Sequence, residues 1–241
     1  MFSFRSIFHT FFSKSKAVAS DSMTGATDPV VPMKTFLIVG LGNIGAEYAA
    51  TRHNIGFLVL DRLAASLGLT WKTDRLGDLA EFKLKGRTFI LLKPATYMNL
   101  SGKAVKYWQT ARNIDIDNIF IVVDELSLPF GTLRIKGNGS DGGHNGLKSL
   151  NEVLGTQKYA RLRFGIGNEF QKGKQIDYVL GEWSEEEVVN LPPLLDACAD
   201  AIRAFALAGL ADAMNKFNKK MPISPSTVNE ITKNTKNLPE L

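Results

Sequence analysis

Continuous apolar runs and alternating segments predict the strands of a sheet. Residues 35–40 (TFLIVG) and 118–125 (NIFIVVDE) are short apolar runs, which is the pattern of strands that are buried on both faces. Residues 79–94 read as two strands that are joined by a hairpin-like turn. Two further segments alternate between apolar and polar positions, as half-exposed strands do: residues 132–136 and 160–167.

Segments with apolar residues at helical spacing lie between and after these strands. They are residues 55–69, 101–112 and 144–155, and a long stretch from Ser184 to about Phe217. Strands that alternate with helices indicate an α/β protein. We therefore expect a single domain that has a mostly parallel twisted sheet with helices on both faces.

Local signals refine the ends of the predicted helices. Ser101 is a candidate N-cap, and Ser184 and Glu187 have the spacing of a capping box. Pro192-Pro193 predicts that the last helical stretch divides into a short helix and a longer one. The reason is that proline removes an N–H donor and clashes with the preceding turn.

The two ends of the chain fall outside this pattern, and we assign the folded domain to residues 34–218. Residues 1–33 are basic and rich in serine, with no acid before Asp21, so they have some resemblance to an organelle transit peptide. We favour the alternative that translation starts at Met33, because Met33 lies directly before the first strand. We expect residues 1–33 to be disordered or untranslated, and residues 219–241 to be a disordered tail.

The bulk composition fits a globular protein and excludes only a few classes of function. The 241 residues are 44% hydrophobic and 22% charged, and the net charge of +5 is compatible with a polyanionic partner without requiring one. Cys198 is the only cysteine, so the chain cannot form an internal disulfide. Such a shortage of cysteine and histidine argues against a His/Cys metal site. No apolar run approaches the roughly 18 residues of a transmembrane helix.

Polar side chains that suit water activation follow three of the predicted strands. Ligands in open α/β sheets bind beyond the carboxyl ends of the strands, so these residues are candidates for one site. Histidine accepts a proton near neutral pH, a carboxylate orients it, and asparagine amides donate to a developing oxyanion. No G-x-S-x-G motif occurs, so direct attack by water is the simpler scheme. The candidates are Asn43, Tyr48 and His53 after the first strand, Tyr97, Met98 and Asn99 after residues 79–94, Asp124, and His144 and Asn145 after a glycine-rich loop.

Each of these residues also has a purely structural interpretation. Histidine near a turn, aspartate at a strand end and asparagine at a helix start often serve the local backbone. Gly40-x-Gly42-x-x-Gly45 matches the dinucleotide-binding fingerprint, but no helix opens at once after it, and Asp61 falls inside a helical pattern. The joint placement of the candidates at three strand ends therefore favours a hydrolytic site over a nicotinamide or flavin site.

Four motifs occur in order along the chain: LIVGLGNIGAEYAATRHNIGF, KPATYMNLSGKAV, VVDELSLPFGTLRIKGNGSDGGHNGLKSL and YARLRFGIGN. Together they resemble the bacterial-type peptidyl-tRNA hydrolase family, over about residues 34–217. The resemblance implies a cytoplasmic, mostly monomeric enzyme with no metal or other cofactor. Its implied partner is peptidyl-tRNA, through the acceptor stem and the CCA end. Its implied reaction hydrolyses the ester that joins the peptide to the ribose, which recycles tRNA from peptidyl-tRNA that stalled ribosomes release.

The resemblance also implies roles for individual residues. His53, in the T-R-H-N motif, matches the family's catalytic histidine, and Asp124 matches its partner aspartate. Asn43 and Asn99 match family asparagines and would bind the water or the oxyanion. The implied substrate-binding residues are Tyr48, Tyr97, Met98, His144 and Asn145, the last two in a mobile lid, and the implied tRNA-binding residues are Arg134, Lys136, Lys148 and Arg161.

Three positions depart from the family pattern without removing a group that we assign to chemistry. Ile44 stands in place of a usual proline, Val123 in place of a frequent histidine, and Ser127 in place of a frequent acid. Two other classes stay open, namely a non-catalytic RNA-binding protein on the same fold and a nucleotide-dependent oxidoreductase. The compartment would be organellar rather than cytoplasmic if residues 1–33 are a transit peptide.

Overall fold

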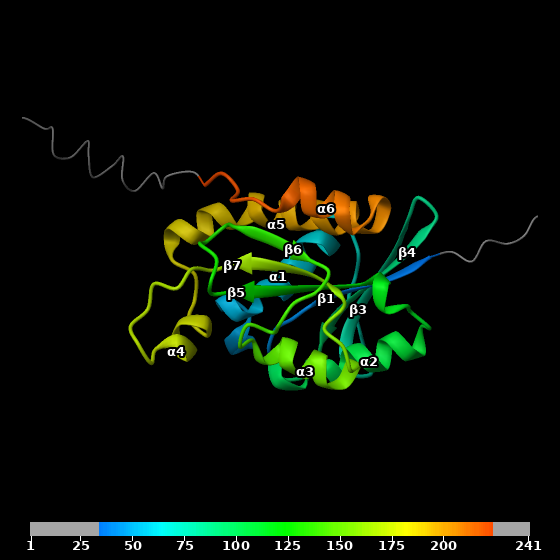
Figure 1. Cartoon of the computed structure of the whole chain (residues 1–241), viewed down its shortest axis with the longest axis horizontal. Helices are drawn as coiled ribbons and strands as arrows, with labels where there is room; N and C mark the ends of the chain where they lie inside the picture. Colours follow the sequence, from blue (N-terminus) through cyan, green and yellow to red (C-terminus); the bar gives the residue numbers. More distant parts are fainter. Residues whose placement is uncertain (1–33, 224–241) are drawn as a thin grey trace, which may run out of the picture. The chain divides into compact units, whose positions relative to one another are not determined.

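The computed structural model describes residues 34–223, so the predictions for residues 1–33 lie outside the described part of the chain. The described residues form one seven-stranded sheet with helices on both faces (Figure 1). The strand order is β2-β3-β4-β1-β5-β7-β6. In chain order the strands are β1 (Thr35–Gly40), β2 (Lys72–Asp74), β3 (Gly77–Leu84), β4 (Arg87–Pro94), β5 (Ile119–Glu125), β6 (Leu133–Lys136) and β7 (Ala160–Gly165).

The centre of the sheet is parallel and its edges are antiparallel. β1 pairs in parallel with β4 and β5, and β5 pairs in parallel with β7. At one edge β2, β3 and β4 pair antiparallel with one another in turn, and at the other edge β6 pairs antiparallel with β7. The α/β class and the parallel centre agree with the prediction, and the complete sheet is mixed. Its parallel strands bring the carboxyl ends of β1, β4 and β5 to one edge.

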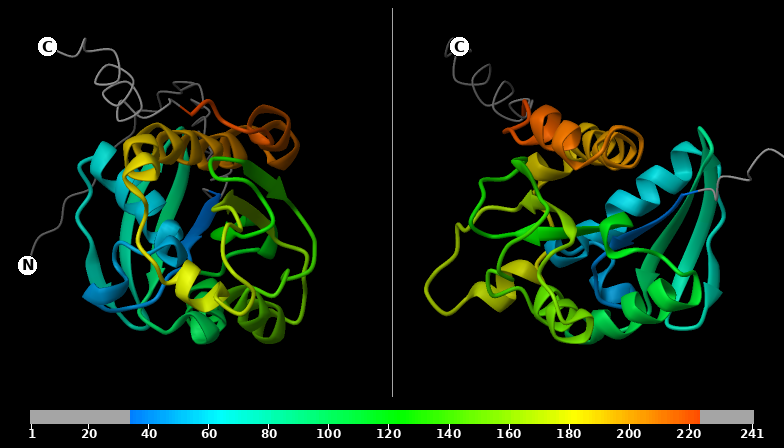
Figure 2. Two further views of the ribbon diagram at one scale, coloured as in Figure 1. Left: turned by 90° about the vertical axis from the view of Figure 1, so that its left-hand side faces the viewer. Right: turned by 45° about the vertical axis from the view of Figure 1, so that its right-hand side comes forward.

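Helices cover the two faces in separate groups, which Figure 2 shows from two further sides. Along β1, Phe36 and Ile38 join the core cluster with α1 and α5, whereas Leu37 and Val39 join the cluster with α2 and α3. Side chains on both faces of β1 are therefore buried. Burial of one such apolar side chain stabilises the fold by roughly 1.5–3 kcal/mol. The α-helices are α1 (Ile55–Ser66), α2 (Ser101–Ala111), α3 (Asn145–Leu154), α4 (Gln175–Val179), α5 (Glu185–Ala208) and α6 (Leu210–Phe217), and the short 3₁₀ helices are η1 (Ala46–Tyr48), η2 (Arg52–Asn54), η3 (Met98–Leu100) and η4 (Ile116–Asn118).

The first turn of α1 lies directly on the ends of β1 and β5. A Cβ atom on Gly56 would lie 2.4 Å from the backbone nitrogen of Leu41, and a Cβ atom on Gly40 would lie 2.2 Å from the carbonyl oxygen of Gly56. Glycine at both positions permits this close approach. Gly40 of the G-x-G-x-x-G pattern therefore serves packing, and η2, which carries His53, is held over the end of β5.

The prediction that Pro192-Pro193 divides the last helix is wrong. α5 runs unbroken through both prolines, and the division lies at Gly209, whose φ of 95° does not continue a helix. Both prolines are exposed, as are Val188 and Val189 one turn earlier. Water can therefore bind the carbonyl groups that lose their N–H partners, which lowers the cost of the prolines.

Other predicted helix ends are partly confirmed. Ser184 and Glu187 form the expected capping box at the start of α5. The N-cap of α2 is Leu100, and Ser101 is the first residue of that helix. The Oγ atom of Ser101 donates to the carbonyl oxygen of Met98 at 2.9 Å. The N-cap prediction is therefore wrong by one residue.

The start of the predicted disordered tail is ordered in the structure. The backbone nitrogen of Leu133 donates to the carbonyl oxygen of Lys219, and that of Met221 donates to the carbonyl oxygen of Gly131. Residues 219–221 thus pair with residues 131–133, at the free edge where β6 begins, because an edge strand offers unpaired backbone groups. This pairing corrects the predicted boundary of the tail. The rest of the predicted tail, residues 224–241, lies outside the described residues.

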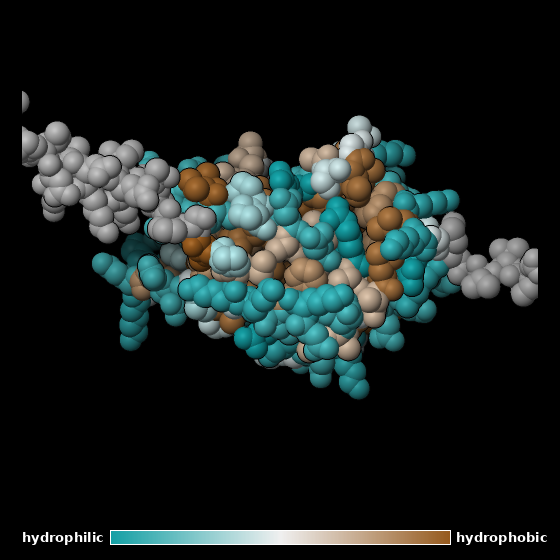
Figure 3. All heavy atoms as spheres, turned by 90° about the horizontal axis from the view of Figure 1, so that it is seen from above, coloured by the Kyte–Doolittle hydropathy of each residue, from teal (hydrophilic) through white to brown (hydrophobic). Residues whose placement is uncertain are grey.

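The described surface is largely polar. Figure 3, seen from above relative to Figure 1, shows hydrophilic residues over most of this face with small apolar patches between them. Scattered apolar groups of this kind are normal on a folded protein. Among the described helices, none combines the length and the hydropathy that a membrane span requires.

Candidate active site

His53 and Asp124 meet at the carboxyl edge of the sheet. His53 lies in η2, and Asp124 is near the end of β5. The Nδ1 atom of His53 is 3.0 Å from Oδ1 and 3.1 Å from Oδ2 of Asp124. Asp124 is only 4% exposed, so its charge depends on these hydrogen bonds rather than on water. Nδ1–H of His53 donates to the carboxylate, which leaves Nε2 as the basic nitrogen.

His144 also contacts Asp124, a contact that the sequence did not reveal. Its Nε2 atom is 2.9 Å from Oδ1 of Asp124, and its ring centroid is 4.9 Å from that of His53. His144 is also the N-cap of α3, where its Nδ1 accepts hydrogen bonds from the backbone nitrogens of Gly146 and Leu147. The two histidines therefore share one buried carboxylate.

Burial and charge act in opposite directions on the pKa values of this group. Burial lowers the pKa of His53, but the adjacent Asp124 carboxylate outweighs it and raises that pKa above its ordinary value. Burial raises the pKa of Asp124, but the two histidines outweigh it and hold that pKa far below its usual range. Asp124 consequently stays ionised throughout the neutral range, as an orienting carboxylate must.

The same three residues are the one set in the described part of the chain whose ligand atoms could surround a metal ion. Their ligand atoms lie within 4.8 Å of one another. However, two backbone N–H groups donate to Nδ1 of His144, so its Nε2 carries the proton. A protonated Nε2 cannot bind a metal, so the hydrogen-bond pattern fits a proton-transfer site better than a metal centre.

Asn43 holds the loop after β1 to two neighbouring segments. Its Oδ1 accepts a hydrogen bond from the backbone nitrogen of Met98 at 2.8 Å. Its backbone nitrogen donates to Oδ1 of Asn54 at 2.8 Å, and Nδ2 of Asn54 donates back to the carbonyl oxygen of Asn43 at 3.0 Å. Asn43 thus has its Nδ2 left for a water or an oxyanion. Asn54 was not among the predicted residues, although its place directly after His53 was a signal.

The other predicted substrate-binding residues differ in their exposure. Met98 is 4% exposed, and its Sδ would be 2.6 Å from a Cβ atom on Gly146, so it packs beneath the start of α3. The structure thus gives Met98 a packing role, and its contact with substrate stays a prediction. Tyr97 and Asn99 are exposed on the neighbouring segment, and Tyr48 is half-buried in η1.

A pocket connects the histidine pair with α4, which the sequence had not implicated. Asn145 lies at its edge, together with the predicted pair His53 and Asp124. Asn43 lines a neighbouring pocket instead. The mixture of apolar wall and polar groups is typical of sites that bind organic ligands. The further residues of the first pocket are Glu125, Leu126, Asp141, Gly142, Gly143, His144, Gln175, Ile176 and Val179.

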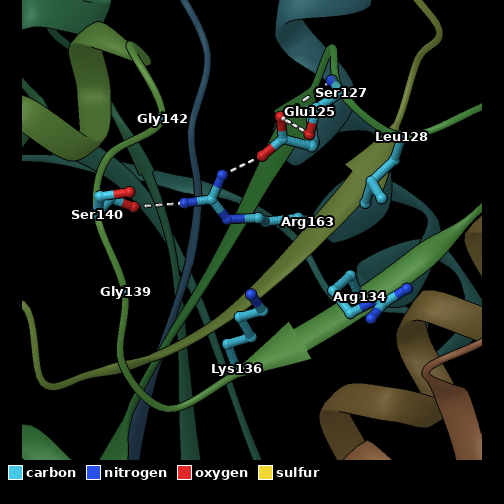
Figure 4. Close-up of a pocket in the computed structure, with 9 residues that line it drawn as sticks. All are labelled: Glu125, Ser127, Leu128, Arg134, Lys136, Gly139, Ser140, Gly142 and Arg163. Carbon is cyan, nitrogen blue, oxygen red and sulfur yellow. Dashed lines mark hydrogen bonds and ion pairs between the residues drawn. The ribbon is translucent and has the colours of Figure 1, made fainter.

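A second, basic pocket lies beside the first one and is shown in Figure 4. Arg134 and Lys136 are exposed on β6 and line it, as does Arg163 of β7. Arg163 pairs with Glu125 and also donates to the carbonyl oxygen of Ser140 at 2.5 Å. The cations of β6 and β7 therefore lie beside the glycine-rich loop that leads to His144. Of the other predicted cations, Lys148 is exposed on α3.

Arg161 has a different role from the predicted contact with tRNA. Its side chain is fully buried, and its guanidinium group donates to the carbonyl oxygens of Gly139 and Gln157 at 2.9 and 2.6 Å. A fully buried cation whose two terminal nitrogens already donate to backbone carbonyls does not reach a phosphate at the surface, so we correct this assignment. Sequence alone could not separate Arg161 from Arg163, because residues two apart on a strand face the same side.

Comparison with known proteins identifies the family of the chain. Residues 37–224 match the family described as peptidyl-tRNA hydrolase. The peptidyl-tRNA hydrolase of Phocaeicola vulgatus is 57% identical over 185 residues, which are 77% of this chain and 99% of that protein. That of Desulforamulus reducens is 45% identical over 185 residues, 76% of this chain and 89% of that protein. The crystal structure of the Acinetobacter baumannii peptidyl-tRNA hydrolase has a TM-score of 0.70 and 36% identity, and the match covers 78% of this chain and 98% of that chain. Because the family match covers most of the chain, the protein belongs to the bacterial-type peptidyl-tRNA hydrolase family.

Proposed function

We propose that the protein hydrolyses the ester bond between a peptide and tRNA, with His53 as the general base. The observation that supports this assignment is the hydrogen bond between Nδ1 of His53 and the buried Asp124, both of which line the first pocket. This contact fixes the ring so that Nε2 is free to accept a proton. Family membership supplies the substrate class, and the geometry supplies the candidate base.

In the proposed reaction, Nε2 of His53 removes a proton from water, and the water oxygen attacks the ester carbonyl carbon. Nδ2 of Asn43, the amide of Asn99, or both donate to the oxyanion that develops. The imidazolium then returns its proton to the ribose oxygen as the ester bond breaks. Asp124 stays ionised and stabilises the imidazolium, and this is an effect that increases in the transition state.

We also propose that the basic pocket binds the acceptor stem of tRNA, with the CCA end directed to His53. Arg134, Lys136 and Arg163 line that pocket, and Lys148 is exposed on α3. Phosphate contacts release counterions, so tRNA affinity should fall as the salt concentration rises. Tyr97 and Asn145 remain proposed contacts of the peptide or the CCA end, as does Tyr48. From the family resemblance we further propose a monomeric, cytoplasmic enzyme.

The test uses the full-length chain and an N-acetylaminoacyl-tRNA. We expect the parent to release the acyl group and His53→Ala to lose at least about 10²–10⁴ of the rate, which is the typical contribution of a general base. Arg62→Ala is a matched control, because Arg62 forms an exposed ion pair with Asp196 on the α1 and α5 helices. That variant should keep the parental rate.

Two results would contradict the proposal in different ways. A folded parent that binds tRNA and releases no acyl group would be an RNA-binding protein on a hydrolase fold. Equal rates for the parent and His53→Ala would leave the reaction in place and exclude His53 as the base.

A further inference from the structure

His144 joins the start of α3 to the carboxylate of Asp124. Its backbone nitrogen donates to the carbonyl oxygen of Asp141 at 3.1 Å, and that of Gly143 donates to Oδ1 of Asp141 at 2.8 Å. This turn directs the His144 side chain into the site, where it is only 10% exposed. Both ring nitrogens have partners there: Nδ1 lies 3.1 Å from the backbone nitrogen of Gly146, and Nε2 lies 2.9 Å from Oδ1 of Asp124.

These partners determine the tautomer of His144. A backbone N–H group can only donate, so Nδ1 of His144 must accept from Gly146, and also from Leu147 at 3.4 Å. A proton on Nδ1 would point at these donors and would leave the first turn of α3 uncapped. The proton of the neutral ring is therefore on Nε2, which faces an acceptor-only carboxylate. His53 has the opposite tautomer, because its Nδ1–H donates to the same carboxylate and its Nε2 is left without a proton.

We propose that His144 is a positioning residue, which donates its Nε2 proton to Asp124 and thereby holds the carboxylate in the orientation that receives Nδ1–H of His53. The proposal rests on the proposed roles of His53 and Asp124. It replaces the predicted role of His144 as a contact for the substrate. The cap of α3 gives the donor its fixed tautomer, so the glycine-rich loop and the base are connected through one side chain.

The donated hydrogen bond also limits the effect of Asp124 on His53. A carboxylate that accepts a second hydrogen bond has more of its charge compensated, so it stabilises the imidazolium of His53 less. Removal of the His144 donor should therefore make His53 hold its proton to a higher pH. A residue that only contacts substrate or packs the loop would change the rate without this shift.

The other charged groups near the pair have their own partners and stay unchanged in the variants below. Glu125 lines the same pocket and pairs with Arg163, and Asp141 accepts the hydrogen bond from Gly143. On the neighbouring elements, Arg52 of η2 pairs with Glu187, and Lys174 before α4 pairs with Asp177. A shift that appears only when His144 changes is therefore assigned to His144.

The first measurement needs no variant. Two-dimensional ¹H–¹⁵N spectra of the imidazoles in the full-length protein at neutral pH distinguish a protonated ring nitrogen from an unprotonated one. We expect Nδ1 of His144 to be unprotonated and its Nε2 to carry the proton. The opposite tautomer would overturn the proposal, whatever the activity of the enzyme.

Three substitutions then separate the cap from the donor. His144→Asn ends near the place of Nδ1, so it can cap α3 but cannot reach Asp124. His144→Gln ends near the place of Nε2, so its amide can donate to Asp124 but cannot cap the helix. His144→Ala removes both functions. Urea unfolding of each variant reports the loss of the cap, and the pH dependence of kcat/KM reports the donor.

We expect Asn and Ala variants to lose about tenfold in kcat/KM, which is the loss that corresponds to one hydrogen bond to a charged group. The acidic limb of their pH profile of kcat/KM should move upward by about 0.5–1 pH unit. His144→Gln should keep the acidic limb of the parent and should have most of the parental kcat/KM. It should unfold at a lower urea concentration than His144→Asn, because it lacks the cap. An unshifted limb in the Asn variant, or a Gln variant no better than Ala, would overturn the proposal.

Failure of this inference differs from failure of the proposed function. If His53→Ala retains the parental rate, His53 is not the base, and the imidazole spectra alone decide the tautomer of His144. If hydrolysis depends on His53 but the acidic limb does not respond to His144→Asn, the reaction stands and only the positioning role fails.

Discussion

Asp124→Asn is the substitution for which the structure gives the most specific outcome. Asparagine has almost the shape of aspartate, but it offers one acceptor oxygen and one donating amide. In the parent, His53 and His144 both donate to the carboxylate. Because the cap of α3 fixes the tautomer of His144, the asparagine oxygen must accept from His144. Its amide then takes the place of Oδ2, which is 3.1 Å from Nδ1 of His53. Two N–H groups oppose each other at that distance, and we expect this repulsion to favour the His53 tautomer that carries its proton on Nε2.

The magnitude follows from the loss of the basic nitrogen. A ring with its proton on Nε2 cannot accept a proton from water, and general-base catalysis contributes typically 10²–10⁴ to a rate. We therefore expect kcat to fall by about 10²–10⁴, or roughly 3–5 kcal/mol of barrier. The loss should not exceed that of His53→Ala, since an orienting group matters no more than the base that it orients. The basic pocket is untouched, so tRNA affinity should stay within about twofold.

Single-turnover release of the acyl group from N-acetylaminoacyl-tRNA measures the chemical step directly. Filter binding of tRNA and urea unfolding should accompany it, so that a loss of rate is not confused with a loss of binding or folding. An Asp124→Asn enzyme that keeps its rate within about threefold of the parent would refute the orienting role and the tautomer argument together.

Further substitutions test three points: the roles assigned to the basic residues, the packing beneath the site, and the dependence of stability on the charge of His53. Arg134→Ala should raise KM and lower the salt slope of tRNA binding by about 1, whereas Arg161→Ala should leave the slope unchanged and cost roughly 2–4 kcal/mol of unfolding free energy in urea. Gly56→Ala should destabilise by about 1–3 kcal/mol or more, and should also lower kcat, because its Cβ would press on the backbone of Leu41. The pKa of His53 is raised in the folded state, so the protonated ring stabilises the fold. This contribution is complete below the ordinary pKa of 6.5 and disappears as the pH rises through the folded-state pKa. The parent should therefore exceed His53→Ala in urea stability by more at pH 5 than at pH 9, and an equal difference at both pH values would contradict the linkage.

The sequence predicted the architecture because each element has a local signal. The apolar run of β5 required burial on both faces, and the capping box of Ser184 and Glu187 marked the start of α5. The double proline misled the prediction for a physical reason. Its cost depends on whether water reaches the carbonyl groups one turn earlier, and only the packing of α5 decides which side of the helix faces water.

Some features of the candidate site also follow from the sequence, and others depend on the tertiary structure. The sequence alone determined that His53 and Asp124 lie at strand ends of one sheet edge, because parallel strands bring their carboxyl ends together. Tertiary structure decided what no pattern along the chain contains: that His144 shares the carboxylate, and that Arg161 is buried while Arg134 is exposed. Residue type and spacing specify which groups are available and which element carries them. Distance, burial and the direction of each hydrogen bond depend on how separate elements pack, and these quantities determine whether a charged side chain does chemistry, binds a phosphate or holds the fold.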